Sequence, residues 1–332
     1  MRVLSALATV LISVVIGFGL FEVYTRIFET DGQNFDIEMW RYAKDLKRVS
    51  DIPGMGHEHV PGTEGVYMGV PVKINLVGWR DDEHPIEKPA ATTRIMMLGD
   101  SLTFGWGVPA DGVTSNILEQ RLNGAAADGG YEILNTGIGN TNTVMQVAYF
   151  LAEGKAYKPD VVVLNYFIND AEPTPSRKAH WLLNRSYAAV FLASRFDTLM
   201  RSYFDRGSWL DYYRGLYTDD QPGWREAQAA FRRLAAFCRE NNIALMVAHY
   251  PELHQLDPYP FAEVTQLVAK MAESEGVPFL DLLPGVQDKR PTSLWVTPTD
   301  AHPNKLAAQS YSAQIAAALQ FRFRALFLEH DP

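Results

Sequence analysis

The sequence has 332 residues, of which 47% are hydrophobic and 21% charged, and its formal net charge at pH 7 is −9. This length and composition are typical of a globular protein with a sizeable core and exclude a disordered chain. The acidic balance argues against a nucleic-acid partner, because phosphate binding needs clustered Lys and Arg.

The first predicted element is an almost continuously apolar run of eighteen residues from Leu4 to Phe21. Eighteen helical residues rise about 27 Å, close to the ~30 Å hydrocarbon core of a bilayer. The run fits a secretory signal peptide, with a weak cleavage site at Gly17-Phe18-Gly19, or an uncleaved anchor. The apolar pattern continues to Phe28, which favours a transmembrane anchor over residues 1–29.

Charges beside this run indicate its orientation. Arg2 precedes the run and Arg26 follows it. The positive-inside rule then favours a cytoplasmic N-terminus. We therefore expect the remainder of the chain to lie outside the cytoplasm.

Residues 30–93 are rich in glycine, proline and charged residues, which predicts a stalk or irregular extension. Two short strands are expected in it, at Val66–Met68 and Val72–Leu76. The local cluster His57-Glu58-His59 could suggest a metal, but alternating His in a Gly/Pro-rich loop is more often solvated. The sequence has no Cys/His metal framework, so we expect neither a metal nor another cofactor.

From residue 94, strand and helix patterns alternate to about residue 325. Strands are predicted at Arg94–Leu98, Tyr131–Asn135, Val161–Tyr166, Ile243–His249 and Val277–Leu282, and helices at 113–123, 143–155, 224–241, 261–275 and 303–320. Alternating strands and helices form right-handed crossovers, which predicts an α/β three-layer sandwich with a five-stranded parallel sheet. The single cysteine, Cys238, excludes an intramolecular disulfide and is expected to be a small buried hydrophobe.

Residues 171–223 interrupt this alternation and are too long for a simple connection, so they are interpreted as a helical insertion. Within 176–206, apolar residues recur at three- and four-residue steps, which predicts an amphipathic helix. The local net charge there is +4. Three roles remain open: packing on the sandwich, a lid over the active site, or contact with anionic lipid headgroups.

A hydroxyl follows the first predicted strand of the sandwich, in the turn Gly99-Asp100-Ser101. Open α/β sheets place their chemistry at the carboxyl ends of strands. A serine is a weak nucleophile unless a base and an orienting acid activate it. His302 and Asp300, near the other end of the chain, supply such a pair. Each motif alone also fits a helix cap, but together they favour acyl transfer.

Acyl transfer also requires hydrogen-bond donors for the oxyanion. The backbone amide of Ser101, an amide in the Gly139–Asn140 turn and the side chain of Asn169 all follow predicted strands. Individually these residues fit ordinary turns and caps. Their joint occurrence at the ends of successive strands favours an oxyanion hole.

The sequence therefore resembles the SGNH hydrolases, also called the GDSL esterase/lipase family, from about Arg94 to Ala317. The resemblance rests on Gly-Asp-Ser-Leu with Phe104-Gly105, and on the motif Asp-x-His-Pro-Asn that starts at Asp300. It implies a flavodoxin-like sandwich. It also implies that Ser101 is the nucleophile, His302 the base, Asp300 the orienting acid and Asn169 an oxyanion donor.

The sequence departs from this family's usual pattern in three places. Phe167 stands where the third block usually has glycine. Ungapped alignment places Asn140 at the donor glycine of the second block, with Gly139 one residue earlier, so the donating amide stays open. The acid lies two residues before His302, where three is the commoner spacing.

The pattern Asn75…Gly78-Trp79-Arg80, together with an N-terminal span, resembles a membrane-anchored bacterial branch of the family. That resemblance implies a single-pass protein of the inner membrane with its catalytic domain, residues 94–325, in the periplasm.

The function implied by the resemblance is that of a serine esterase acting on an acyl ester, with acetyl favoured, of an envelope polysaccharide or lipid. The sequence does not decide between water and a sugar hydroxyl as acceptor, so a carbohydrate O-acetyltransferase remains an alternative. A non-catalytic envelope binding module is the third alternative. The joint presence of Ser101, Asn169, Asp300 and His302 argues against it.

Overall fold

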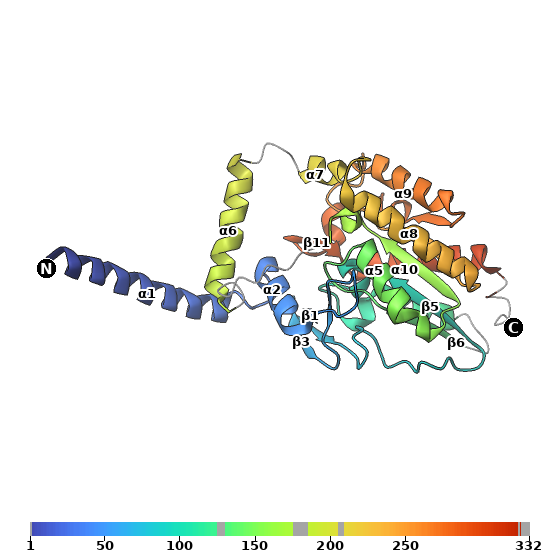
Figure 1. Ribbon diagram of the computed structural model, residues 1–332, viewed down its shortest axis with the longest axis horizontal. Helices are drawn as coiled ribbons and strands as arrows, with labels where there is room; N and C mark the ends of the chain where they lie inside the picture. Colours follow the sequence, from blue (N-terminus) through green and yellow to red (C-terminus); the bar gives the residue numbers. More distant parts are fainter. Residues whose placement is uncertain (1, 125–129, 175–184, 205–208, 325, 327–332) are drawn as a thin grey trace.

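The computed structural model describes residues 2–124, 130–174, 185–204, 209–324 and 326. At its centre is a five-stranded sheet in the order β6-β5-β7-β8-β9, and all neighbouring pairs are parallel. The strands are β5 (Thr92–Leu98), β6 (Gly130–Asn135), β7 (Val161–Tyr166), β8 (Ala244–His249) and β9 (Phe279–Asp281). Helices cover both faces of the sheet (Figure 1). The predicted α/β sandwich with five parallel strands is confirmed.

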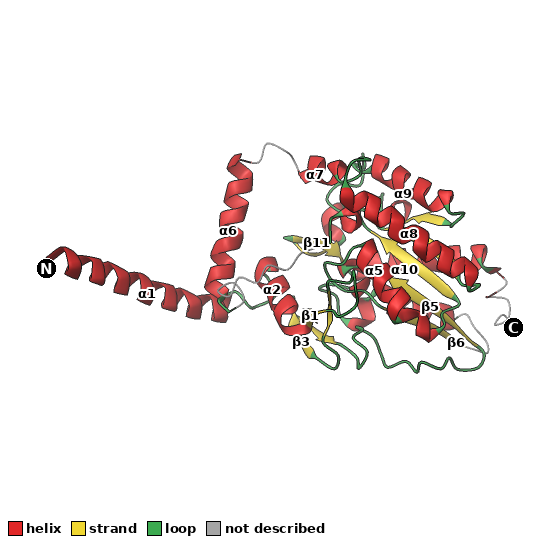
Figure 2. Cartoon of the chain, viewed as in Figure 1, coloured by secondary structure: helices red, strands yellow, loops and turns green. Residues whose placement is uncertain are grey.

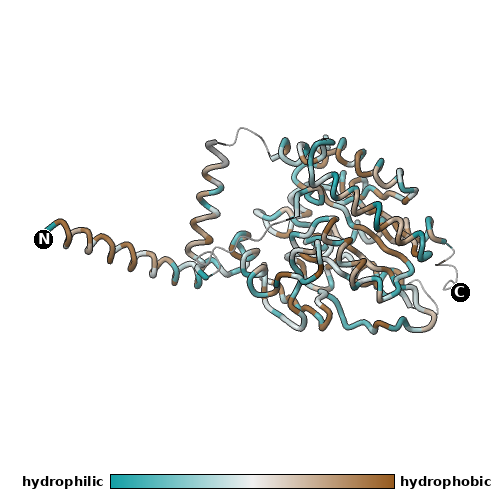
Figure 3. Tube along the Cα trace, viewed as in Figure 1, coloured by the Kyte–Doolittle hydropathy of each residue, from teal (hydrophilic) through white to brown (hydrophobic). Residues whose placement is uncertain are grey.

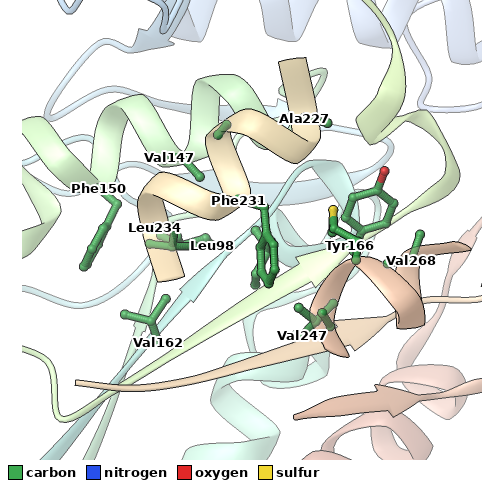
Figure 4. Packing of buried hydrophobic residues seen from close by; sticks show 14 of the residues in the cluster. Leu98, Val147, Phe150, Val162, Tyr166, Ala227, Phe231, Leu234, Val247 and Val268 are labelled. Atoms are coloured by element: carbon green, nitrogen blue, oxygen red, sulfur yellow. The ribbon is translucent and has the colours of Figure 1, made fainter. Parts of the chain in front are cut away.

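Alternating side chains of the central strands pack in two separate hydrophobic layers, because successive residues of a strand point to opposite faces of the sheet. Leu98, Val162 and Val247 pack with α5 (Thr143–Ala152), α8 (Pro222–Glu240) and α9 (Ala262–Ser274), as Figure 4 shows. On the other face, Met97 and Val163 pack with α4 (Thr114–Asn123) and α10 (Lys305–Arg322). All six residues of β7 are buried, as expected for a central strand. Cys238 of α8 is also buried.

The N-terminal helix α1 (Arg2–Phe28) extends away from the sandwich (Figures 1 and 3). Its most apolar 18-residue window has a mean hydropathy of 2.5 and is 0% buried. Among the described residues, α1 alone is long and apolar enough to cross a membrane, and a signal sequence near the N-terminus has the same properties. The helix is therefore a candidate span.

Residues 30–93 do not form the expected stalk, although the two short strands expected in them overlap an antiparallel pair that is present. This segment forms α2 (Phe35–Leu46) and two antiparallel strand pairs, β1 (Lys47–Val49) with β2 (His57–His59) and β3 (Glu64–Tyr67) with β4 (Val70–Lys73) (Figure 2). Apolar side chains of the segment form one buried cluster with Phe104 and Trp106, which follow Ser101. Glycine and proline here shape tight turns between short elements that need the sandwich as their packing partner.

The insertion between β7 and α8 contains α6 (Tyr187–Phe204) and α7 (Trp209–Gly215). Residues 175–184 and 205–208, which belong to the predicted amphipathic segment 176–206, lie outside the described residues. The helix predicted in that segment is present as α6. It contacts α1 and α2 and stands apart from the sandwich (Figure 1).

Candidate active site

The turn after β5 places Ser101 at the carboxyl end of the sheet. Ser101 is the first residue of the short helix α3 (Ser101–Phe104), and the side chain of Asp100 caps this helix by accepting a 2.9 Å hydrogen bond from the Leu102 amide. A Cβ atom on Gly99 would lie 2.0 Å from Thr103 Oγ1, so the chain can turn this tightly only with glycine. The Ser101 side chain is thereby fixed at the start of the helix.

Ser101, His302 and Asp300 form a continuous hydrogen-bonded chain. Ser101 Oγ lies 2.9 Å from His302 Nε2, and His302 Nδ1 lies 2.6 Å from Asp300 Oδ1. A carboxylate at Nδ1 requires the proton on that nitrogen, which leaves Nε2 free to accept the serine proton. The structure thus brings together the three residues that the sequence singled out, although Ser101 and His302 are 201 positions apart.

A short antiparallel pair that the sequence patterns did not reveal presents the acid and the base. Asp300 and His302 lie on β11 (Asp300–Pro303), which pairs with β10 (Trp295–Thr297) before α10 begins. Asn304 caps α10 by accepting hydrogen bonds from the Leu306 and Ala307 amides. The Asp-x-His-Pro-Asn motif therefore combines two site residues with a helix cap.

Asp300 is held as a carboxylate by three donors. It accepts hydrogen bonds from the backbone amide and Nδ1 of His302 and from Trp106 Nε1, at 3.0, 2.6 and 3.0 Å. Burial raises the pKa of this carboxyl, but the hydrogen bonds and charge of His302 and the bond from Trp106 outweigh it and lower the pKa. The acid therefore stays ionised and orients His302.

Two aromatic residues that sequence reasoning missed shield the imidazole of His302. Trp106 is 1% exposed, and Phe35 of α2 lies with its ring centroid 5.9 Å from that of His302. The motif Gly105-Trp106-Gly107 was a signal for Trp106, because a tryptophan between two glycines directly follows the nucleophile turn. Phe35 had no such signal, since it belongs to the supposed stalk.

The second predicted oxyanion segment lies beside the nucleophile turn, and its two candidate amides differ. The amide of Gly139 already donates a 3.0 Å hydrogen bond to the hydroxyl of Tyr42. Asn140 has a left-handed backbone with φ of 61°, a conformation that suits the glycine it replaces. Among the described residues, no hydrogen bond from the Asn140 amide is recorded. These contacts favour Asn140 over Gly139 as the donor.

Lys47 and His57, from β1 and β2, hold the carbonyl group of Gly139. Lys47 Nζ lies 2.5 Å and His57 Nε2 3.1 Å from that oxygen. This carbonyl shares a peptide group with the Asn140 amide, and the N–H and C=O of a trans peptide point in opposite directions. Holding the carbonyl toward Lys47 therefore turns the amide of Asn140 away from it. The sequence favoured solvated side chains for His57 and His59, and this is wrong for His59, which is 2% exposed and contacts the Tyr42 hydroxyl and the Gly78 carbonyl.

Asn169, the third predicted donor, lies in the turn after β7. Its Nδ2 donates a 3.1 Å hydrogen bond to Asp100 Oδ2, which orients the amide group and leaves its second N–H for a ligand. The neighbouring carboxylate of Asp170 fixes the turn by accepting hydrogen bonds from the Phe167 amide, Thr143 and Gln146. Burial, followed by the charge of Asp100, raises the pKa of Asp170 well above its usual value.

An open cavity of about 270 Å³ adjoins the candidate triad. Its lining includes Leu102, Phe167, Asp300 and His302, together with Phe35 from α2 and Trp209 and Tyr213 from α7. Its lining includes no residue of α6. Of the described residues of α6 and α7, those that line the cavity belong to α7, and the described contacts of α6 do not support the lid hypothesis for 176–206.

A second imidazole–carboxylate pair lines the same cavity. His254 Nδ1 contacts Glu252 Oε1, and the ring centroid of His254 lies 5.3 Å from that of Trp209 and 5.0 Å from that of Trp295. The hydrogen bond to Glu252 raises the pKa of His254. Sequence reasoning did not single out this pair, because Glu252 and His254 fall in a loop without a recognisable motif.

Comparison with known proteins identifies a family and a set of distant structural neighbours. Residues 97–309 match the model of the GDSL-like lipase/acylhydrolase family. A protein from Desulfitobacterium hafniense that is assigned to the lipolytic G-D-S-L family is similar at 15% identity, with a TM-score of 0.43, and the match covers 68% of this chain and 99% of that one.

Two further solved structures are similar to a comparable degree. The lipase/acylhydrolase from Enterococcus faecalis has 15% identity and a TM-score of 0.42, covering 69% of this chain and 96% of its own. An acetylxylan esterase from Geobacillus stearothermophilus has 16% identity and a TM-score of 0.45, and the match covers 68% of this chain and 93% of the esterase. The comparison with curated proteins gave no match.

Proposed function

Because the chain belongs to the GDSL-like lipase/acylhydrolase family, we propose that it cleaves short acyl esters, acetyl esters above all, through Ser101, His302 and Asp300. It is an ester-hydrolysing enzyme of the SGNH type. The observation that carries the proposal is the chain of hydrogen bonds from Ser101 Oγ through His302 to Asp300. This is the arrangement that activates a serine hydroxyl.

In the first half-reaction, Ser101 Oγ attacks the ester carbonyl carbon while His302 Nε2 takes the hydroxyl proton. The negative charge that develops on the carbonyl oxygen is stabilised by the amides of Ser101 and Asn140 and by the Asn169 side chain. The intermediate then collapses, the bond to the alcohol oxygen breaks, and His302 gives its proton to the leaving alcohol. Asp300 stabilises the imidazolium throughout.

In the second half-reaction, water gives a proton to His302 and attacks the acyl-serine. The resulting intermediate releases a carboxylic acid, and the proton returns to Ser101. The proton that leaves with the alcohol is replaced by one from water, so the triad ends in its starting protonation state. The carbohydrate O-acetyltransferase alternative differs only in that a sugar hydroxyl replaces water. The Glu252–His254 pair, which also lines the cavity, favours this alternative because it could bind the acceptor hydroxyl.

The size of the cleft supports a short acyl group. Its volume of about 270 Å³ is below the range of about 300 to 1,000 Å³ typical of drug-sized ligands. Phe35, Phe167 and Trp209 wall it with rigid rings. Envelope carbohydrate or lipid is the proposed alcohol component, because α1 is proposed to anchor the enzyme in the inner membrane with the catalytic domain in the periplasm.

The test compares 4-nitrophenyl esters of acetate, butyrate and octanoate, with and without a serine-directed phosphonate. We expect acetate to give the highest kcat/KM and the phosphonate to modify Ser101, as detected by mass spectrometry of the peptide. A preference for octanoate would contradict the short-acyl proposal. Phosphonate on another residue would contradict the triad.

The acceptor is tested separately, by incubating the acetyl-enzyme with cell-envelope polysaccharide in ¹⁸O water. Hydrolysis puts the label into free acetate. Acetyl transfer instead gives acetylated polysaccharide without label. The second result would replace the esterase by the O-acetyltransferase without changing the roles of the triad.

A further inference from the structure

Helix α6 carries an exposed stripe of large apolar side chains. Leu192, Phe196 and Leu199 are 48%, 62% and 52% exposed, and their spacing of four and three residues aligns them on one side of the helix. Met200, at 37%, borders this stripe. The first turn of α6 is buried instead, since Ala188 is 0% exposed. Contiguous exposed apolar surface of this kind marks an interaction site.

The first turn of α6 is fixed to the C-terminal part of α1. Glu22 Oε2 accepts hydrogen bonds from Ser186 Oγ and from the amide of Ala188, at 2.7 and 2.8 Å. Arg26 forms an ion pair with Glu22 at 2.7 Å and lies 4.6 Å above the ring of Tyr187. Glu22 of α1 thus caps the N-terminus of α6, and Arg26 holds Glu22 and Tyr187 in place.

This junction lies at the depth where a membrane interface is expected. About 20 helical residues span the hydrocarbon core, which starting from Arg2 brings the interface to the neighbourhood of Glu22. Trp40 of α2 and Tyr187 of α6 contact each other there, with ring centroids 4.8 Å apart. Tryptophan and tyrosine favour the headgroup region because their rings are apolar and their N–H or O–H is polar.

From this junction, α6 runs off to the side of α1 rather than along it (Figure 1). Apolar positions recur along α6 as they do along α1 (Figure 3). We propose that α6 lies flat in the headgroup region of the bilayer that α1 spans, with Leu192, Phe196 and Leu199 facing the acyl chains. The inference rests on the membrane-anchoring part of the proposed function.

Such a helix would give the enzyme two contacts with the membrane instead of one. A single span lets the attached domain swing, whereas a span and a surface helix joined at Glu22 restrict its tilt. Because α2 packs on both α6 and the domain core, the tilt of α6 is passed to the domain. The restricted orientation favours ester substrates presented at or near the membrane surface.

The test uses spin labels on the full chain in nanodiscs of phosphatidylcholine and phosphatidylglycerol, in a Cys238→Ala background. Single cysteines replace Leu192, Phe196 or Leu199, and the matched control is Asp197→Cys on the opposite side of α6. Power saturation measures collisions of each label with oxygen, which concentrates in lipid, and with an aqueous nickel chelate. Leu11→Cys in α1 reports on the span itself, and no readout depends on esterase activity.

We expect the labels on the stripe to lose most of their nickel collisions relative to Asp197→Cys and to gain oxygen collisions. If all four α6 positions are equally accessible to nickel while the label at Leu11→Cys is buried in lipid, the surface-helix proposal is wrong and the anchor proposal stands. Leu11→Cys exposed to nickel would overturn the anchor and the inference with it. Dipolar coupling between stripe labels of two protomers would show that a second copy of the chain covers the stripe, and the proposal of lipid contact would be wrong.

Discussion

The ammonium group of Lys47 lies 2.5 Å from the carbonyl oxygen of Gly139, in the peptide group that also contains the Asn140 amide. Lys47 is 8% exposed, and it belongs to a segment that precedes the region matched by the family model. The hydrogen bond fixes this peptide and polarises it, which strengthens its N–H as a donor. We therefore propose that Lys47, a residue outside the hydrolase motifs, positions the peptide group of the proposed oxyanion donor.

The first prediction concerns this contact. Lys47→Met is expected to lower kcat for 4-nitrophenyl acetate about tenfold with little change in KM. This is a fraction of the ~10²–10³-fold loss in kcat that removal of a whole oxyanion donor causes. Lys47→Arg keeps the charge and should restore most of the activity. Lys73→Met, an exposed lysine of β4, serves as the matched control. A rise in KM alone, or no rescue by arginine, would remove Lys47 from this role.

The second prediction tests the triad as a unit. Ser101→Ala and His302→Ala should each lower kcat by about 10⁴ to 10⁶, and the double variant should be no slower than either single one. The reason is that proton transfer and nucleophilic attack fail together. Ser274→Ala, on the surface of α9, is the control for serine replacement. Multiplicative losses in the double variant would contradict the coupled mechanism.

The third prediction concerns Asn169. Its replacement by alanine should lower kcat about 10² to 10³-fold and leave KM nearly unchanged, because an oxyanion donor acts chiefly in the transition state. Steady-state kinetics of Asn169→Ala and of the surface control Asn241→Ala provide the measurement. A change confined to KM would instead assign Asn169 to ground-state binding.

The fourth prediction concerns stability in acid. His249 is 0% exposed, both of its ring nitrogens lack a hydrogen-bond partner among the described residues, and burial lowers its pKa to about 3. In the unfolded chain its pKa is about 6.5. Because the unfolded chain binds the extra proton, the stability present above pH 6.5 is lost as pH falls toward 3, by about 2 kcal/mol at pH 5.

His249→Leu should remove that loss, so its free energy of unfolding should decline less between pH 7.5 and pH 5 than that of the wild type. Guanidinium unfolding of the full chain in detergent at both pH values measures the difference. His59, whose pKa burial likewise lowers to about 3, keeps its own contribution in both proteins. Identical pH slopes for variant and wild type would contradict the assignment to His249.

The sequence alone determined the central architecture and the candidate chemistry. Hydrophobic periodicity located all five strands of the sheet, because burial on one or both faces imposes a regular pattern on neighbouring residues. Gly99-Asp100-Ser101 and Asp300-x-His302 were recognisable because a strand-end turn and a triad require particular residue types. The parallel sheet then brings the ends of successive strands together, which made Ser101 and Asn169 predictable neighbours.

Only the tertiary structure decided which residues surround that chemistry. Phe35, Tyr42 and Lys47 lie in a segment whose glycines, prolines and charges predicted a stalk, because its short elements are stable only when packed on the sandwich. The proposal of Asn140 rather than Gly139 as oxyanion donor rests on the hydroxyl of Tyr42, 97 positions away from Gly139, which accepts a hydrogen bond from the Gly139 amide. Local patterns record which residues prefer to be buried, but not which distant partner buries them.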